Sequence, residues 1–135
     1  MEYTIPAEHF VDCLYTIKAA ITREDVDVHF PLECRFVAVD DIPLSPTYQR
    51  ESAYIAVHMF KGMAYRPYFD LVEDIFRTYD GRPHWGKLHT CTAAELRALY
   101  PQWDHFMDLR AQLDPGGCFL NDYLRAYVDI PSCKA

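Results

Sequence analysis

Two short stretches of the sequence carry side chains that could act on a bound molecule. Residues 82–89 read Arg-Pro-His-Trp-Gly-Lys-Leu-His and place an imidazole, an indole and an ammonium group within four residues. In the second stretch, Glu33-Cys34-Arg35, two opposite charges lie two residues apart. We expect the two stretches to form one wall of a substrate site.

The charged residues of these stretches suit the recognition of oxygen atoms. The guanidinium of Arg35 is a planar fork of donors, which can hold a carbonyl or hydroxyl oxygen or fix a carboxylate. Lys87 offers a compact cation for a reacting oxygen or for a reduced, anionic cofactor. Residues two apart on a strand point the same way, so Glu33 and Arg35 could orient each other. The same pattern is also that of a structural ion pair on a sheet.

Other chemistries are less well supported by the spacing. His84 and His89 form an H-x4-H pair, which is neither the helical pair of metalloproteases nor a zinc-finger pattern, so we expect no metal site. Cys91 lies two residues after His89, but adjacency in sequence is not the arrangement of a thiol nucleophile and its base. A single strand histidine such as His58 is more often structural than functional.

Hydrophobic periodicity predicts the elements that must position these residues. A short strand over residues 2–6 precedes a helix over 7–21, and strands over 26–39 and 52–60 precede a second helix over 65–79. Further helices are predicted at 93–99, where Thr92 and Glu95 match a capping box, and from Pro101 onward. Residues 119–128 read as a last helical or irregular segment. Cys13 and Cys34 fall at apolar positions and are expected in the core.

Alternation along the two longer strands separates a polar face from an apolar one. On the first strand the polar face carries His29, Pro31, Glu33, Arg35 and Val37, and on the second His58 lies on one face with Tyr54, Ala56 and Phe60. Consecutive strands usually pair, so an antiparallel pair is expected. His58 could then join the face of Glu33 and Arg35. The predicted fold is α+β, with helices packed on one face of an antiparallel sheet and the other face contributing to the site.

Composition limits the partners and the cellular compartment. The formal net charge of −7 disfavours nucleic acid, because no basic stripe is available for phosphates. The sequence contains no run of about 18 apolar residues, so we expect no transmembrane segment. We also expect no signal peptide. Five cysteines without C-x-x-C spacing suit reduced thiols, so we expect a cytoplasmic location. The five glycines form no G-x-G-x-x-G and no P-loop, so another domain or subunit must complete any cofactor site.

Several motifs together resemble one enzyme family over nearly the whole chain. They are Glu2-Tyr-Thr-Ile-Pro6, Pro31-Leu-Glu-Cys-Arg-Phe36, Asp41-Ile-Pro-Leu-Ser-Pro46, Arg82-Pro-His-Trp-Gly-Lys87, Leu113-Asp-Pro-Gly-Gly117 and Phe119-Leu-Asn-Asp-Tyr-Leu124. In this order they resemble the C-terminal, substrate-side part of the sugar-1,4-lactone oxidases, the family of D-arabinono- and L-gulono-1,4-lactone oxidase in the vanillyl-alcohol-oxidase superfamily.

The resemblance implies a flavoprotein in which an N-terminal domain binds FAD. Residues 1–128 would be the C-terminal substrate, or cap, domain, which covers the flavin and shapes the substrate pocket, and residues 129–135 would be a tail. A CH–OH group of a sugar-1,4-lactone would give hydride to the flavin. The full-length enzyme of this family could also associate with a membrane.

The resemblance also implies roles for individual residues. Glu33 and Arg35 would bind and polarise the substrate hydroxyls, and Lys87 would stabilise developing negative charge or help to take the proton. The residues that would contact substrate or flavin are His58, His84, Trp85 and Asn121. Of these, His84 and Trp85 would line the pocket, and Asn121 would anchor the end of the chain against the flavin domain.

The FAD-binding domain is not among these 135 residues, so we expect the chain alone to be inactive. Its partner would be that domain, either in cis or as a separate subunit, and self-association through an exposed apolar patch is a further expectation. Other hypotheses remain open. The chain could be a non-catalytic module that binds a sugar or a partner protein, part of an alditol oxidase-like flavoenzyme, or a self-contained acid–base enzyme using Glu33 and Lys87.

Overall fold

The computed structural model describes residues 1–128, and the tail expected at 129–135 lies outside them. In chain order the elements are β1 (Glu2–Pro6), the 3-10 helix η1 (Ala7–His9), α1 (Phe10–Arg23), β2 (Glu33–Val37), β3 (Ser52–Ala56), α2 (Arg66–Thr78), β4 (Arg82–Pro83), α3 (Ala93–Leu99), α4 (Trp103–Leu113) and α5 (Asp122–Arg125). They fall into two compact units. The first comprises Met1–Asp41 and Ser45–Thr90, and the second comprises Ile42–Leu44 and the chain from Cys91 onward.

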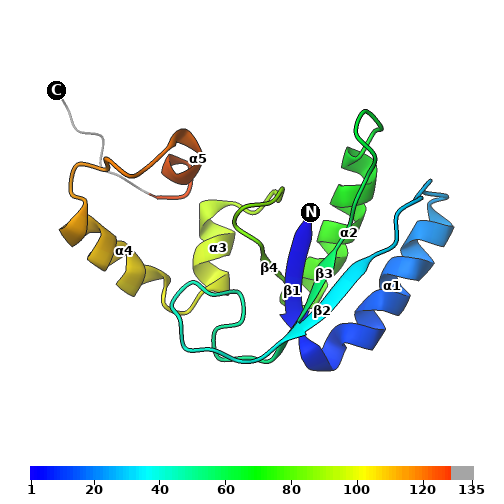
Figure 1. The fold of residues 1–135 in the computed structure, drawn as a ribbon, viewed down its shortest axis with the longest axis horizontal. Coiled ribbons are helices and arrows are strands. Elements are labelled where there is room, and N and C mark those ends of the chain that lie inside the picture. The colour runs from blue at the N-terminus through cyan, green and yellow to red at the C-terminus, as the bar shows by residue number, and fades with distance from the viewer. Residues whose placement is uncertain (129–135) are drawn as a thin grey trace. The chain divides into compact units, whose positions relative to one another are not determined.

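The first unit is built on a four-stranded sheet in the order β2-β3-β1-β4 (Figure 1). Every neighbouring pair is antiparallel, which confirms the expected pairing of β2 with β3. In the register, Ala56 lies opposite both Glu2 of β1 and Glu33 of β2. Tyr54 likewise lies between Thr4 and Arg35. Glu2 of β1 and Glu33 and Arg35 of β2 therefore share one face of the sheet with Tyr54 of β3.

The opposite face of the sheet packs against α1 and α2 and forms the core. Tyr3 stacks on Phe76 of α2, with ring centroids 5.0 Å apart, and Phe36 of β2 meets Phe10 of α1 at 4.8 Å. The fully buried apolar residues of this layer include Ile5, Cys13, Ile17, Ile55, Val72 and Phe76. Helices on one face of an antiparallel sheet confirm the α+β prediction.

The strands are shorter than the sequence pattern predicts. The strand predicted over 26–39 is limited to Glu33–Val37, and that predicted over 52–60 ends at Ala56. β3 pairs with its neighbours as far as Ala56, which lies opposite Glu2 of β1 and Glu33 of β2. Beyond this point the amide of Val57 donates to the carbonyl of Met1 at 3.0 Å, and the terminal ammonium of Met1 donates to the carbonyl of Val57 at 3.1 Å. Cys34 is exposed, contrary to expectation, because β2 is the edge strand.

The stretch at 82–89 begins with a short strand. Arg82 and Pro83 form β4, which pairs with β1, and Arg82 is buried. Its guanidinium donates to the carbonyls of Tyr48 at 3.0 Å and Pro46 at 3.3 Å. The guanidinium of Arg82 therefore holds the 46–48 segment to the sheet.

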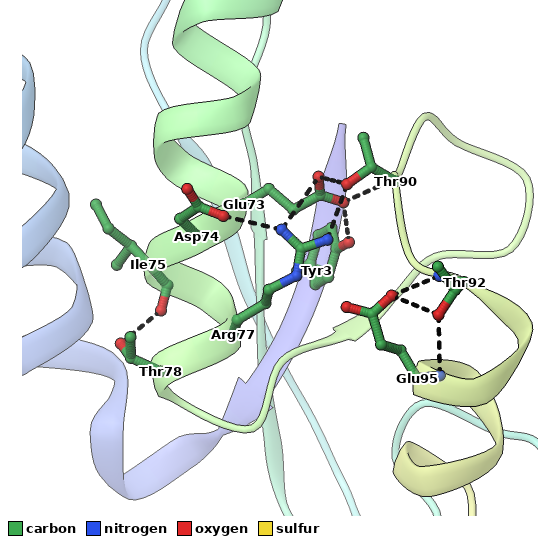
Figure 2. Close-up of polar contacts among 9 residues, drawn as sticks. All are labelled: Tyr3, Glu73, Asp74, Ile75, Arg77, Thr78, Thr90, Thr92 and Glu95. Carbon is green, nitrogen blue, oxygen red and sulfur yellow. Dashed lines mark hydrogen bonds and ion pairs between the residues drawn. The ribbon is translucent and has the colours of Figure 1, made fainter.

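The second unit contains three helices among its described residues. The capping box predicted at Thr92 and Glu95 is present: the Thr92 hydroxyl accepts from the Glu95 amide at 3.3 Å, and the Glu95 carboxylate accepts from the Thr92 amide at 2.6 Å (Figure 2). After α4, the carboxylate of Asp114 accepts from the amides of Cys118 and Phe119. Within residues 1–128, no helix combines the length and apolar character needed to cross a bilayer.

Candidate functional site

A buried carboxylate, Glu2, joins the two cations that the sequence places in separate stretches. The Glu2 side chain is fully buried on β1. One of its oxygens, Oε1, accepts from Nη2 of Arg35 on β2, and the other, Oε2, forms an ion pair with Nζ of Lys87. The cross-strand register makes this possible, since it brings the first residue of β1 level with the start of β2. Arg35 and Lys87 thus share one carboxylate.

The guanidinium of Arg35 is held on further sides by Glu33 and Tyr54. Its Nη1 donates to Oε1 of Glu33 at 3.1 Å. Its Cζ lies 4.6 Å from the centroid of the Tyr54 ring, a cation–π contact. Burial raises the pKa of the Tyr54 hydroxyl, so that it stays neutral beside the guanidinium. The fork of Arg35 is therefore fixed in orientation before any ligand arrives.

His58 extends the cluster beyond the end of β3. Its Nε2 lies 3.8 Å from Oε2 of Glu33, an ion pair when the imidazole is protonated and too long for a direct hydrogen bond. We refer to Glu2, Glu33, Arg35, His58 and Lys87 together as the polar cluster. With His58 neutral, the two carboxylates of the cluster balance its two cations.

A turn over residues 84–87 delivers Lys87 to the cluster. The amide of His84 donates to the carbonyl of Glu2 at 3.0 Å, and the amide of Lys87 donates to the carbonyl of His84 at 3.0 Å. Nδ1 of His84 accepts from the amide of Gly86 at 3.1 Å. A Cβ on Gly86 would lie 3.3 Å from Cε1 of His84, a close contact that the glycine avoids. The turn is tied directly to β1, next to the carboxylate that Lys87 meets.

The segment that follows this turn is anchored at Thr90 by Glu73, a buried carboxylate of α2 (Figure 2). Glu73 accepts from the amide of Thr90 at 2.7 Å, from the Thr90 hydroxyl at 2.5 Å and from the hydroxyl of Tyr3. Burial alone would raise the pKa of Glu73, but the hydrogen bonds from Thr90 and Tyr3 outweigh it and hold the pKa below its ordinary value. Residues 84–90 are thus fixed at both ends.

In the polar cluster the side chain of Glu2 is buried, and the other four side chains are partly exposed. The side chain of Glu2 is 0% exposed, whereas those of Arg35, Lys87, His58 and Glu33 are 44%, 39%, 39% and 57% exposed. A bound molecule could therefore reach the donors of Arg35 and Lys87 and the acceptors of Glu33 and His58. Such an alternation of donors and acceptors suits a molecule rich in hydroxyl groups.

Of the seven residues predicted for the site, four lie together, two lie in the adjoining turn and one lies in the second unit. Glu33, Arg35, His58 and Lys87 come together in the polar cluster. His84 and Trp85 are half-buried in the turn that carries Lys87. Asn121 lies in the second unit, where its side chain caps α5 by accepting from the amide of Leu124 at 2.8 Å.

Two residues of the site escaped the sequence analysis, Glu2 and Tyr54. The sequence analysis predicts a strand at Glu2 and assigns this residue no function, although an acidic residue at the start of an apolar strand could have marked it as a candidate. Its partners could not be read from the sequence, because they depend on which strands flank β1.

The buried carboxylate of Glu73 lines a small cavity, and the described residues offer no metal site. Among the described residues no group of three or more His, Cys, Asp or Glu side chains could hold a metal ion. A cavity of about 40 Å³ is lined in part by Glu73, His89 and Thr90. That volume admits a few water molecules at most, not a sugar.

Comparison with known proteins gives one family and several relatives. A family model described as D-arabinono-1,4-lactone oxidase matches residues 1–127. The chain is 50% identical over 125 residues to an L-gulono-1,4-lactone dehydrogenase of Mycobacterium tuberculosis, covering 93% of this chain and 29% of that protein. It is 39% identical over 128 residues to L-gulonolactone oxidase of Mus musculus, covering 91% and 29%. It is 36% identical over 129 residues to an alditol oxidase of a Streptomyces species, covering 95% and 31%. The chain spans less than a third of each relative.

Proposed function

This chain belongs to the D-arabinono-1,4-lactone oxidase family, and from that premise we propose that it forms the substrate-side part of an FAD-dependent oxidoreductase. The reaction is the oxidation of a CH–OH group of a sugar-1,4-lactone. The observation that carries the proposal is the polar cluster, in which Arg35 and Lys87 are held side by side by Glu2 and remain half-exposed. Residues 1–128 act as a cap domain, and without the flavin-binding part the chain is inactive.

The side chains present here fit only the reacting end of such a cofactor. FAD, when bound, supplies the acceptor for the hydride that leaves the substrate carbon. The chain has no glycine-rich motif for the cofactor phosphates. The half-exposed cations Arg35 and Lys87 suit instead an anionic ring or a reacting oxygen.

Each partly exposed residue of the polar cluster has a role that follows from its contacts. Arg35, fixed by Glu2, Glu33 and the Tyr54 ring, orients the substrate by donating to a hydroxyl oxygen. Lys87 is ion-paired with Glu2, so we assign it the stabilisation of negative charge on the reacting oxygen. Glu33 accepts the hydroxyl proton, and His58, 3.8 Å away, is the next group that can receive it. His84 and Trp85 line the pocket.

The exposed edge of the sheet supports the proposal of a covering partner. All five residues of β2 are exposed, among them Phe36 at 64%. Unpaired edge strands and exposed apolar side chains are ordinarily covered by another part of a protein. The partner is the flavin-binding part, in cis or as a separate subunit. Asn121, in the second unit, anchors the end of the chain against that part. Self-association of the chain is the alternative if neither is present.

The test is flavin reduction in the FAD-loaded protein that contains this sequence. We expect anaerobic bleaching of the flavin absorbance by L-gulono-1,4-lactone or D-arabinono-1,4-lactone. Lys87→Met should lower the rate constant of bleaching by about 10²-fold or more, because charge stabilisation at the reacting oxygen is lost. Glu8→Gln, an exposed change on η1, is the matched control and should leave the rate unchanged.

Different results would support the competing hypotheses. Bleaching by an alditol such as xylitol, but not by the lactones, would favour an alditol oxidase, the activity for which the Streptomyces relative is named. Tight sugar binding without flavin and without turnover would favour a binding module. Turnover without flavin that is lost in Lys87→Met would favour a self-contained acid–base enzyme.

A further inference from the structure

Glu2 differs from the other members of the polar cluster because a ligand cannot touch it. Its side chain is fully buried, while Glu33, Arg35, His58 and Lys87 are all partly exposed. It is nevertheless the residue that contacts both cations, one through each carboxylate oxygen. Glu2 can therefore influence a bound molecule only without contact, through the positions of Arg35 and Lys87 and through its own charge.

The geometry gives Glu2 two separable effects. The first is spacing, because a carboxylate that meets one cation at each oxygen sets the separation of a guanidinium and an ammonium that would otherwise repel each other. The second is charge, because Glu2 and Glu33 together balance Arg35 and Lys87. A buried charge interacts more strongly with its neighbours than an exposed one, so Glu2 contributes more to that balance than the partly exposed Glu33.

We propose that Glu2 is a positioning residue, which holds Lys87 and Arg35 at the separation required by the substrate hydroxyl and keeps the site free of net charge. This inference rests on the proposed function, in which Arg35 and Lys87 act on that hydroxyl. A site without net charge suits neutral molecules, and removing the buried charge turns it into an anion-binding site.

Two substitutions separate spacing from charge in the FAD-loaded protein that contains this sequence. Glu2→Gln keeps the length and removes the charge, whereas Glu2→Asp keeps the charge and shortens the reach by one methylene. Both should lower kcat, by about 10²-fold, because small displacements of catalytic groups are costly. The change in kcat should exceed the change in KM. Glu8→Gln on η1 again serves as the control.

A double-mutant cycle with Lys87→Met tests whether Glu2 acts through Lys87. If it does, Glu2→Gln should lower kcat much less in the Lys87→Met protein than in the wild type, because the group that it positions has been removed. Full additivity of the two substitutions would overturn the proposal, and so would a wild-type kcat in Glu2→Gln. If Glu2→Gln does not fold, Glu2→Asp decides: wild-type kcat overturns the proposal, and reduced kcat with an unchanged unfolding midpoint supports it.

Sulfate binding provides a readout that needs no turnover. Side-chain ¹⁵N resonances of Arg35 and Lys87, followed during a sulfate titration, should show about tenfold tighter binding to Glu2→Gln than to wild type or to Glu2→Asp. Equal sulfate affinity in wild type and Glu2→Gln would overturn the charge role of Glu2. If the wild-type protein oxidises no lactone, the proposed function fails, while the sulfate titration still reports on Glu2.

Discussion

At the scale of residues, Glu33 and Arg35 belong to one ion pair but depend differently on the fold. Arg35 also binds the buried carboxylate of Glu2, whereas Glu33 is more than half exposed and meets only Arg35 and His58 among the contacts described above. Breaking a buried pair leaves an uncompensated charge, while exposed pairs contribute little to stability. The two residues should therefore be distinguishable by stability as well as by activity.

We expect Arg35→Ala to lower the free energy of unfolding by about 2 kcal/mol, because the buried carboxylate of Glu2 loses the guanidinium as a counter-charge and keeps the ion pair with Lys87. Glu33→Gln should lower it by less than about 1 kcal/mol. Both should reduce turnover of the FAD-loaded protein. Urea denaturation and anaerobic flavin reduction, run on the same preparations, measure the two effects. Equal stability losses without any loss of turnover would indicate a purely structural ion pair.

At the scale of elements, the first unit depends on the short strand β1, which lies between β3 and β4 (Figure 1). One face of β1 supplies Tyr3 and Ile5 to the core, and the other supplies Glu2 and Thr4 to the polar face. Tyr3 donates to Glu73 on one side of the sheet, and Glu2 binds the site cations on the other. A five-residue strand thus connects the core to the site.

In the second unit, the capping box of α3 gives a prediction at the element scale. Thr92→Ala removes the hydroxyl that accepts from the Glu95 amide, and should destabilise this seven-residue helix by about 1 kcal/mol. Hydrogen exchange of the α3 amides should accelerate by about fivefold, the equivalent of that free energy.

The matched control is Thr22→Ala in α1, where the hydroxyl donates to the carbonyl of Lys18 and caps nothing. Alanine is the better helix former at such a position, so no loss of protection is expected there. Equal acceleration in α1 and α3 would show that the effect of Thr92→Ala comes from the loss of a threonine rather than from the cap.

At the scale of the whole molecule, half-buried His89 and buried Glu73 make stability depend on pH. Burial lowers the pKa of His89 below its ordinary value of 6.5, and hydrogen bonds from Thr90 and Tyr3 outweigh burial in lowering the pKa of Glu73 below 4.5. In both cases the unfolded chain binds a proton more readily than the folded one. By linkage, folding stability rises with pH wherever that difference exists.

We therefore expect stability to fall in two stages as the pH is lowered. The first should begin near pH 6.5, where unfolded His89 takes up a proton, and the second below pH 4.5, where unfolded Glu73 does so. Thermal unfolding midpoints between pH 8 and pH 3 measure both. His89→Asn should remove the first stage and Glu73→Gln the second. An unchanged pH profile in both variants would assign the acid sensitivity to other groups.

Much of the fold could be predicted because it rests on local patterns. The period of apolar residues located α1 and α2 to within a few residues, Thr92 and Glu95 marked the start of α3, and alternation placed Glu33 and Arg35 on one strand face. The predicted strands extend beyond the observed ones, because the point at which a strand ends depends on its neighbouring strands. Cys34 was expected in the core because its position in the pattern is apolar, while the position of β2 at the sheet edge is not a local property.

The sequence by itself determined the fold class, the family and the residues that could bind a hydroxyl-rich molecule, because all of these are carried by residue types and by spacing along the chain. Only the tertiary structure decided that these residues meet. Glu2 and Arg35 are 33 residues apart, and they meet because β3 pairs with both of their strands in a register that sets Glu2 level with Glu33. Register and strand order are set by packing across the sheet, and so the buried carboxylate that organises the site became visible only in the fold.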